Sequence, residues 1–254
     1  MFNWNDEISK CIKDNYKEEC KKRKANCFKV NYNKNGKGIL ILGINPAGDD
    51  LAALNDQSSN LPYFYYIGTE KNIKNVTYNK YFKPLYELAN SVFDNNVKWD
   101  WCNTDWNEYE NIIATEKSLK DYFQVIKKYY DDHKSKEYTL YVGDLIYIHE
   151  TKQGNILDWL KCDKELKYYI KNSFNAHLNL LIEKGVKDLI IYINNAQASQ
   201  WIAEIFNSNK QESCFTYEYK GRKYPIVLGS MIQGQRAMDV FSRDRLIKEL
   251  KSKI

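Results

Sequence analysis

The chain has 254 residues, of which 43% are hydrophobic and 28% charged, with a net charge of +5. This balance is ordinary for a globular protein, and its basic residues interleave with acids, which excludes a dense polybasic tail. No apolar run approaches the roughly 20 residues of a membrane-spanning helix. The charged N-terminal segment, Met1–Cys20, lacks the apolar core of a signal peptide, so we expect a cytoplasmic, monomeric protein that does not bind membranes.

The first half of the chain predicts helix and strand in turn. Apolar residues recur at every fourth position over 5–24 and predict a helix there. The continuous apolar run Ile39–Leu42 predicts a buried strand. Residues 49–78 lack periodicity and predict a long loop, which at this length is usually functional. A helix is expected over Tyr81–Val92.

The second half repeats the alternation of strands and helices. Residues 94–137, with an amphipathic stretch near Ser118–Tyr130, give no clear assignment. The elements expected beyond them are a strand over Tyr138–Val142, a helix over 163–183, a strand over Asp188–Ile193, a helix over Ala196–Phe206, a hairpin of Cys214–Tyr219 and Tyr224–Leu228, and a final helix over Asp239–Lys251.

This order predicts the fold class. Strands separated by helices favour a central parallel sheet with helices on both faces. We therefore expect an α/β fold of three layers, αβα, around a four-stranded, mostly parallel sheet. No repeat or low-complexity linker interrupts the sequence, which predicts a single domain over 1–254 with an insertion around 94–137.

Metal-ligand spacing does not occur in the sequence. The six cysteines, at positions 11, 20, 27, 102, 162 and 214, form no Cys-x-x-Cys pair, and the chain has only three histidines. Zinc and iron–sulfur sites need ligands at short, regular spacing. We therefore expect no metal and no cofactor, and reduced thiols.

The turn after the first strand is the strongest candidate for a site. Its sequence, Gly43-Ile44-Asn45-Pro46-Ala47-Gly48, places Asn45 at the carboxyl end of the strand, where open α/β sheets bind ligands. The glycines let the backbone approach a ligand closely, and Pro46 stiffens the turn. The alternative is a structural turn in which Asn45 caps the local backbone.

Polar residues also follow the other predicted strands. They are Asp144, the pair Asn194-Asn195, and the loop Gly229–Arg236. Because the carboxyl ends of parallel strands meet at one edge of a sheet, we expect these groups to converge with Asn45 in a cleft.

Two motifs resemble the uracil-DNA glycosylase superfamily, most closely its mismatch-specific and single-strand-selective branches. Gly43-Ile44-Asn45-Pro46 is similar to the Gly-x-Asn-Pro-Gly turn of these families, with Ala47 in place of the usual glycine. Asn79-Lys80-Tyr81-Phe82-Lys83 is similar to their Asn-Arg-Phe-Trp-Lys helix start. The resemblance implies the glycosylase fold, a base flipped out of DNA, and hydrolysis of its N-glycosidic bond.

The resemblance also implies a set of site residues. Asn45, which would position the attacking water, and Asp144 are the expected catalytic residues. The expected substrate-binding residues are Gly43, Ile44, Pro46, Ala47, Gly48, Phe64, Tyr65, Tyr66 and Asn194. The expected DNA-binding residues are Ser230, Met231, Ile232, Gln233, Gln235 and Arg236. Met231 and Ile232 would form an apolar wedge, or alternatively pack into the core.

Two departures from the family bear on the reaction. The closing loop Gly229–Arg236 contains no histidine, whereas the family often uses one to stabilise the departing base. Asp144 occupies the place of a base-reading asparagine. An ionised aspartate only accepts hydrogen bonds, which favours a base with an amino group. Alternatively, Asp144 caps the next helix or pairs with Lys152, and the nearby His149 is structural.

The sequence thus supports one main function and two alternatives. The main expectation is a DNA base-excision glycosylase with DNA as its partner. The first alternative is a non-catalytic protein that binds nucleic acid or a nucleotide with the same fold. The second is hydrolysis of a free nucleoside or nucleotide, which the modest charge of +5 fits as well as DNA.

Overall fold

The computed structural model describes ten stretches of the chain. They are residues 3–23, 36–45, 77–94, 138–148, 150, 152–161, 164–183, 185–206, 212–232 and 237–254. Within helix α4 the side chains are described from Pro84 onward. The expected insertion around 94–137 lies almost wholly outside these stretches.

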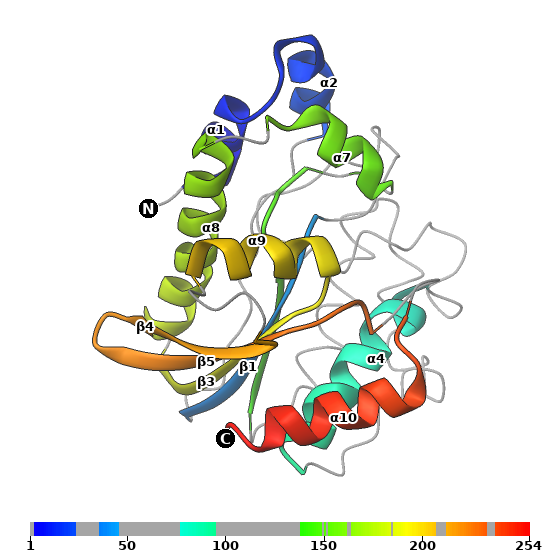
Figure 1. The fold of residues 1–254 in the computed structure, drawn as a ribbon, viewed down its shortest axis with the longest axis vertical. Coiled ribbons are helices and arrows are strands. Elements are labelled where there is room, and N and C mark those ends of the chain that lie inside the picture. The colour runs from blue at the N-terminus through cyan, green and yellow to red at the C-terminus, as the bar shows by residue number, and fades with distance from the viewer. Residues whose placement is uncertain are drawn as a thin grey trace, which may run out of the picture.

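A mixed sheet of five strands forms the centre of the described structure (Figure 1). In the order β2-β1-β3-β5-β4, its strands are Thr139–Asp144, Gly36–Gly43, Val186–Ile193, Arg222–Leu228 and Cys214–Tyr219. The first four run parallel, and β4 pairs antiparallel with β5. The α/β class and the mostly parallel sheet are confirmed. The sheet has a fifth strand because both arms of the predicted hairpin pair within it.

Helices cover both faces of the sheet. Helices α8 (Lys164–Glu183) and α9 (Ala196–Phe206) pack on each other and on β3, with α1 (Trp4–Lys10) against α8. Helices α4 (Thr77–Val92) and α10 (Val240–Lys251) lie side by side in Figure 1. A right-handed crossover places α4 on the opposite face from α8, since β1 leads to β2 in one direction and β2 to β3 in the other. Helix α10 packs on α4 and so lies in the same layer.

The first strand is as buried as its composition predicts. Every side chain from Ile39 to Leu42 is 0% exposed. A parallel strand covered by helices on both faces needs such a continuous apolar run, because neither face meets water.

The N-terminal helix expected over 5–24 is wrong in its extent. The structure has α1, a 3₁₀ turn at Asp14–Tyr16, and α2 (Lys17–Lys22) instead. Ile12 forms an antiparallel bridge with Leu160, and the amide of Lys13 donates to the carbonyl of Trp159 at 2.9 Å. This pairing interrupts a helix that the apolar spacing alone favours.

Helix α7 (Gln153–Trp159) was not expected from the sequence. It has seven residues, which is too short to show a helical repeat, and it includes Gly154, a weak helix former. None of the described helices is long and apolar enough to cross a membrane.

Candidate functional site

The order of the strands points to one edge of the sheet. The chain leaves β1 toward β2 on one side, whereas it leaves β3 toward β5 on the other. Open α/β sheets bind ligands at the carboxyl edge where the strand order reverses in this way. Asn45 follows β1 and Asn194 follows β3, so both flank this switch point.

Four residues form a row across this edge. Gly43 is in register with Asp144. Asn194 and Gly229 come one residue after the paired Ile193 and Leu228, and their amides continue the ladder, donating to Leu42 and Ile193 carbonyls at 2.8 and 3.1 Å. We call Asp144, Gly43, Asn194 and Gly229 the carboxyl-edge row. Polar side chains and glycines alternate along it.

The row faces the layer of α4 and α10. A Cβ added at Gly143 would meet the ring of His177 from α8 at 3.0 Å, so this position faces α8. Successive residues of a strand point to opposite faces, and Asp144 therefore faces the other way.

Glycine at position 43 leaves room for the carboxyl group of Asp144. A Cβ at this position would overlap Oδ1 of Asp144. The side chain of Asp144 therefore leans over β1, at the switch point. Gly229 has a similar role, because a Cβ there would lie 2.6 Å from the hydroxyl oxygen of Tyr192, which donates to the carbonyl of Ser230.

Asp144 is buried and its carboxyl group is not fully used. The residue is 1% exposed, and Oδ2 has no hydrogen-bond partner among the described residues. Burial raises the pKa of Asp144 to about 7. Removing a carboxylate from water without a partner favours the protonated form. The group is therefore neutral below pH 7 and can both donate and accept hydrogen bonds, unlike the ionised aspartate assumed from the sequence.

Helix α8 fixes the backbone that carries Asp144. Nε2 of His177 lies 2.9 Å from the carbonyl oxygen of Asp144, and Oγ of Ser173 donates to the carbonyl of Leu145 at 2.7 Å. Since a carbonyl only accepts, Nε2 carries the proton and Nδ1 accepts from the hydroxyl of Tyr141 at 2.9 Å. Burial lowers the pKa of His177 to about 4, so the ring is neutral.

The sequence interpretation missed this support. The only indication of this support in the sequence is that Ser173 and His177 lie four residues apart on the otherwise apolar face of a predicted helix.

Asn45 holds the loop that follows β2. Its side-chain amide donates to the carbonyl of Ile148 at 3.3 Å and to that of Glu150 at 2.8 Å. These bonds engage both amide hydrogens. Their acceptors lie 103 and 105 residues away along the chain, whereas the structural alternative for this turn expects bonds to the local backbone. The expected positioning of water by Asn45 stays a prediction.

A buried ion pair lies behind the same loop. Glu150 is 6% exposed, its Oε1 accepts from the amide of Lys152 at 2.8 Å, and its Oε2 lies 3.5 Å from Nη1 of Arg23. The guanidinium of Arg23 also lies over the ring of Trp159, 5.6 Å from its centroid. Nothing in the sequence indicates this pair, because its partners are far apart along the chain.

The two asparagines after β3 have different partners. Oδ1 of Asn194 accepts from the amide of Ile232 at 3.0 Å. Oδ1 of Asn195 accepts from the amides of Gln197 and Ala198, at 2.9 and 3.1 Å, and so caps α9. Asn194 therefore fastens the loop after β5 to the site.

The residues expected to bind DNA lie in that loop. Ile232 is 5% exposed and belongs to the core, as the alternative interpretation expects, whereas Met231 is half-buried and Ser230 is exposed. Their contact with DNA stays a prediction.

Many of the expected site residues lie outside the described residues. They are Pro46, Ala47, Gly48, Phe64, Tyr65, Tyr66, Gln233, Gln235 and Arg236, together with His149 and the side chains of Asn79–Lys83.

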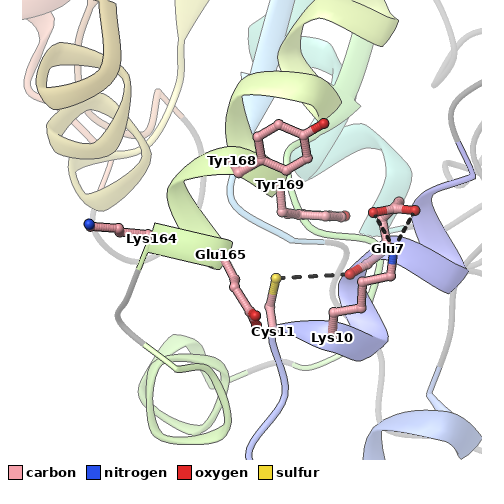
Figure 2. Close-up of a pocket in the computed structure, with 7 residues that line it drawn as sticks. All are labelled: Glu7, Lys10, Cys11, Lys164, Glu165, Tyr168 and Tyr169. Carbon is pink, nitrogen blue, oxygen red and sulfur yellow. Dashed lines mark hydrogen bonds and ion pairs between the residues drawn. The ribbon is translucent and has the colours of Figure 1, made fainter.

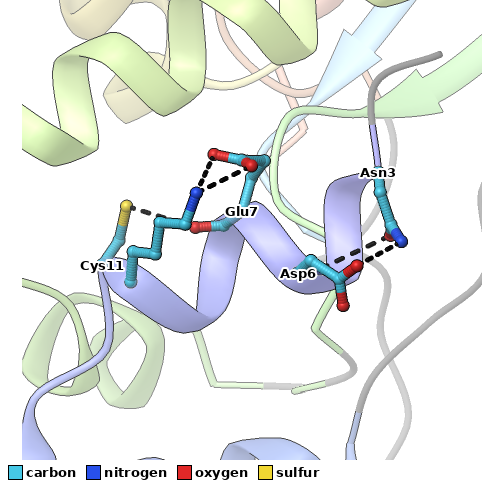
Figure 3. Close-up of polar contacts among 5 residues, drawn as sticks. Asn3, Asp6, Glu7 and Cys11 are labelled. Atoms are coloured by element: carbon cyan, nitrogen blue, oxygen red, sulfur yellow. Dashed lines mark hydrogen bonds and ion pairs between the residues drawn. The ribbon is translucent and has the colours of Figure 1, made fainter.

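A cavity lies apart from the row. It has a volume of about 310 Å³ and is lined by Glu7, Lys10, Cys11, Lys164, Glu165, Tyr168 and Tyr169, from α1, the residue after it and α8 (Figure 2). Lys10 pairs with Glu7 at 2.8 Å, and the Cys11 thiol donates to the Glu7 carbonyl at 3.9 Å. Figure 3 shows these bonds beside that of Asn3 to Asp6, at 2.6 Å. Of the groups that line it, Lys10 and the thiol of Cys11 bond to Glu7, and the cavity is lined by α1, Cys11 and α8 rather than by the ends of strands, so the row is the stronger candidate site.

Among the described residues, no group of three or more histidine, cysteine, aspartate or glutamate side chains is placed to hold a metal ion. Comparison of the chain with protein-family models, with curated proteins and with solved structures finds no match. A function for this chain therefore has to come from the chemistry of the carboxyl-edge row.

Proposed function

We propose that this chain is a DNA base-excision glycosylase, which hydrolyses the N-glycosidic bond between a damaged or modified base and its sugar. The observation that carries the proposal is the buried carboxyl group of Asp144, which leans over Gly43 at the switch point with Oδ2 unpartnered among the described residues. Buried polar groups nearly always have a partner, so an unused one at the ligand-binding edge of the sheet favours recognition of a polar ligand.

The proposed reaction makes two demands on the site. It needs a water molecule near C1′ of the sugar and stabilisation of the negative charge on the departing base. The resemblance of the Gly43–Gly48 turn to glycosylase turns supports a role for Asn45 in positioning the water. Its amide hydrogens hold the loop at Ile148 and Glu150, so the oxygen Oδ1 would orient the water.

A second candidate function is binding of a base or nucleotide without catalysis. The specific observation in its favour is that both amide hydrogens of Asn45 already bond to backbone carbonyls. In that case the row would hold the same ligand, but the glycosidic bond would stay intact.

One experiment separates the two functions. The protein is incubated with single- and double-stranded oligonucleotides that each carry one uracil, hypoxanthine, xanthine or amino-bearing modified base, and hot alkali then cleaves any abasic site. We expect strand cleavage with at least one of these bases and, in the Asn45→Ala variant, a loss of at least tenfold in rate.

The matched control is Asn179→Ala. Asn179 accepts one hydrogen bond from Tyr219 at 3.2 Å on α8, away from the carboxyl edge, and its loss should leave the cleavage rate within twofold of the original. Tight binding of an oligonucleotide without cleavage supports the second function. Neither binding nor cleavage with any member of the panel contradicts both.

A further inference from the structure

The buried polar side chains described at the candidate site divide into those already engaged and one, Asp144, that is not fully engaged. Asn45 and Asn194 bond to backbone groups of neighbouring loops, and Asn195 caps α9. Among the described residues at this edge, the carboxyl group of Asp144 is the buried side chain with an unpartnered oxygen. Its backbone is fixed on one side by His177 and on the other by the ladder to β1.

The proposed glycosylase needs a hydrogen-bond donor for the departing base. The closing loop offers no histidine for this purpose. A preorganised donor aimed at the atom where negative charge develops is one of the most effective catalytic devices, and a carboxylic acid kept neutral in a dry site can supply it.

We propose that the neutral carboxyl group of Asp144 donates a hydrogen bond to an acceptor atom of the departing base, and that this group takes the place of the missing histidine. The inference rests on the proposed function and assigns a catalytic role to one residue of it. It also reverses the expectation from the sequence, since a neutral acid favours a base that presents an acceptor over one that presents only an amino group.

The reaction balances without a change in Asp144. The bond between C1′ and the base nitrogen breaks, and its electron pair leaves on the base. The oxygen of water forms the new bond to C1′, and the proton that the water loses ends on the released base. Asp144 stabilises the charge during this step and keeps its own proton.

The groups around Asp144 explain why the rate is expected to follow the protonation of this one carboxyl group. On α8, His177 contacts the backbone of Asp144 and is neutral, and on β1 the carboxyl group faces Gly43, which carries no charge. In the layer that Asp144 faces, Glu87 of α4 and Arg243 of α10 pair with each other at 3.3 Å. The pKa of Asp144 is raised to about 7 by burial, and the described residues contribute no charge to this shift. Loss of its proton would remove the donor and place a negative charge beside an anionic leaving group.

The test compares two substitutions across pH with the best substrate of the oligonucleotide panel. In the original protein we expect kcat/KM to fall about tenfold per pH unit above pH 7, because one proton is lost. Asp144→Asn keeps a donor that does not titrate, so its rate should stay flat and exceed that of the original protein at pH 9. Asp144→Leu removes the donor and should lose about 10²- to 10³-fold at pH 6.

The control is Asp188→Asn, which makes the same substitution at an exposed position near the start of β3 and should leave the pH profile unchanged. An original protein whose rate does not fall above pH 7, or an Asp144→Asn variant that keeps the same fall, overturns the role of Asp144 and leaves the proposed glycosylase standing. Absence of base release from every oligonucleotide at every pH, with folded protein confirmed by circular dichroism, contradicts the proposed function and this inference with it.

Discussion

Asp144 and His177 show how burial sets the chemistry of single residues in this protein. They lie at the same end of β2, on opposite faces of the sheet, and both are neutral in the folded protein near pH 6. In the unfolded chain at that pH the aspartate is ionised and the histidine largely protonated. On folding near pH 6, His177 therefore releases a proton and Asp144 binds one, and both groups make stability depend on pH.

The substitution Asp144→Asn tests this dependence. The raised pKa of Asp144 stabilises the protein most at low pH, and that contribution is lost as pH rises from about 4 to about 7. The variant lacks this loss, so its free energy of unfolding should match the original below pH 4 and exceed it above pH 7, by on the order of 4 kcal/mol.

Urea unfolding of both proteins between pH 4 and 8 measures this difference. His177, whose lowered pKa costs stability as pH falls from about 6.5 to about 4, is present in both proteins and cancels. A difference that stays constant over this range would show that Asp144 has an ordinary pKa in the folded protein.

Among the secondary-structure elements, helix α8 holds the end of β2 in place. Ser173 and His177 lie on one face of the helix and donate to two successive carbonyls, of Leu145 and Asp144. These carbonyls are buried and lie at the end of the strand, so they need side-chain donors. Helix α8 thereby positions the carboxyl-edge row from the opposite side of the sheet and contributes no side chain to the side on which Asp144 lies.

We expect Ser173→Ala to lower the free energy of unfolding by about 1–3 kcal/mol, because the buried carbonyl of Leu145 loses its donor. Ser91→Ala is the matched control. Ser91 makes the same kind of bond at 2.8 Å, but to Glu87 in its own helix, and its loss should cost less than about 0.5 kcal/mol. Equal costs, measured by urea unfolding, would mean that the bond to Leu145 does not hold the end of β2.

At the scale of the whole molecule, the N-terminal segment is joined to the candidate site through one loop. Arg23, at the end of α2, pairs with Glu150, and the carbonyl of Glu150 receives a hydrogen bond from Asn45 at the end of β1. The segment around Ile12 also pairs with Leu160 after α7. The first residues of the chain therefore support the loop that faces the switch point.

Removal of Arg23 should be costly, because it leaves the carboxylate of Glu150 buried without a positive charge beside it. It also removes the bond of Arg23 to Glu19 at 2.6 Å, but Glu19 is 40% exposed and so loses less. With the side chains of Arg23 and Glu150 only 15% and 5% exposed, we expect Arg23→Met to lower the free energy of unfolding by about 3 kcal/mol. The double substitution with Glu150→Gln should restore most of this loss. Lys17→Met breaks the exposed pair with Asp14 and should leave the free energy of unfolding nearly unchanged, because solvent screens this pair. A double variant as unstable as Arg23→Met, measured by thermal unfolding, would contradict this account.

How far the sequence predicts the molecule depends on the range of the interactions involved. The run Ile39–Leu42 identifies the central strand, and the spacing over 163–183 identifies α8, because hydrophobic periodicity is a local property. The break after α1 was not predictable, since it depends on pairing between Ile12 and Leu160, which are distant in the sequence.

The sequence by itself determined the α/β class and placed Asn45, Asp144 and Asn194 at the ends of strands. Both follow from local features, namely the apolar runs and the turn residues that come after them. Only the tertiary structure decided what each side chain does there. Asn45 and Asn194 bond to loops, whereas Asp144 keeps a buried oxygen without a described partner. The physical reason is that Gly43, α8 and the neighbouring loops together determine which groups are buried and which partners they have. The carboxyl group of Asp144 is therefore neutral near pH 6 only when the chain is folded.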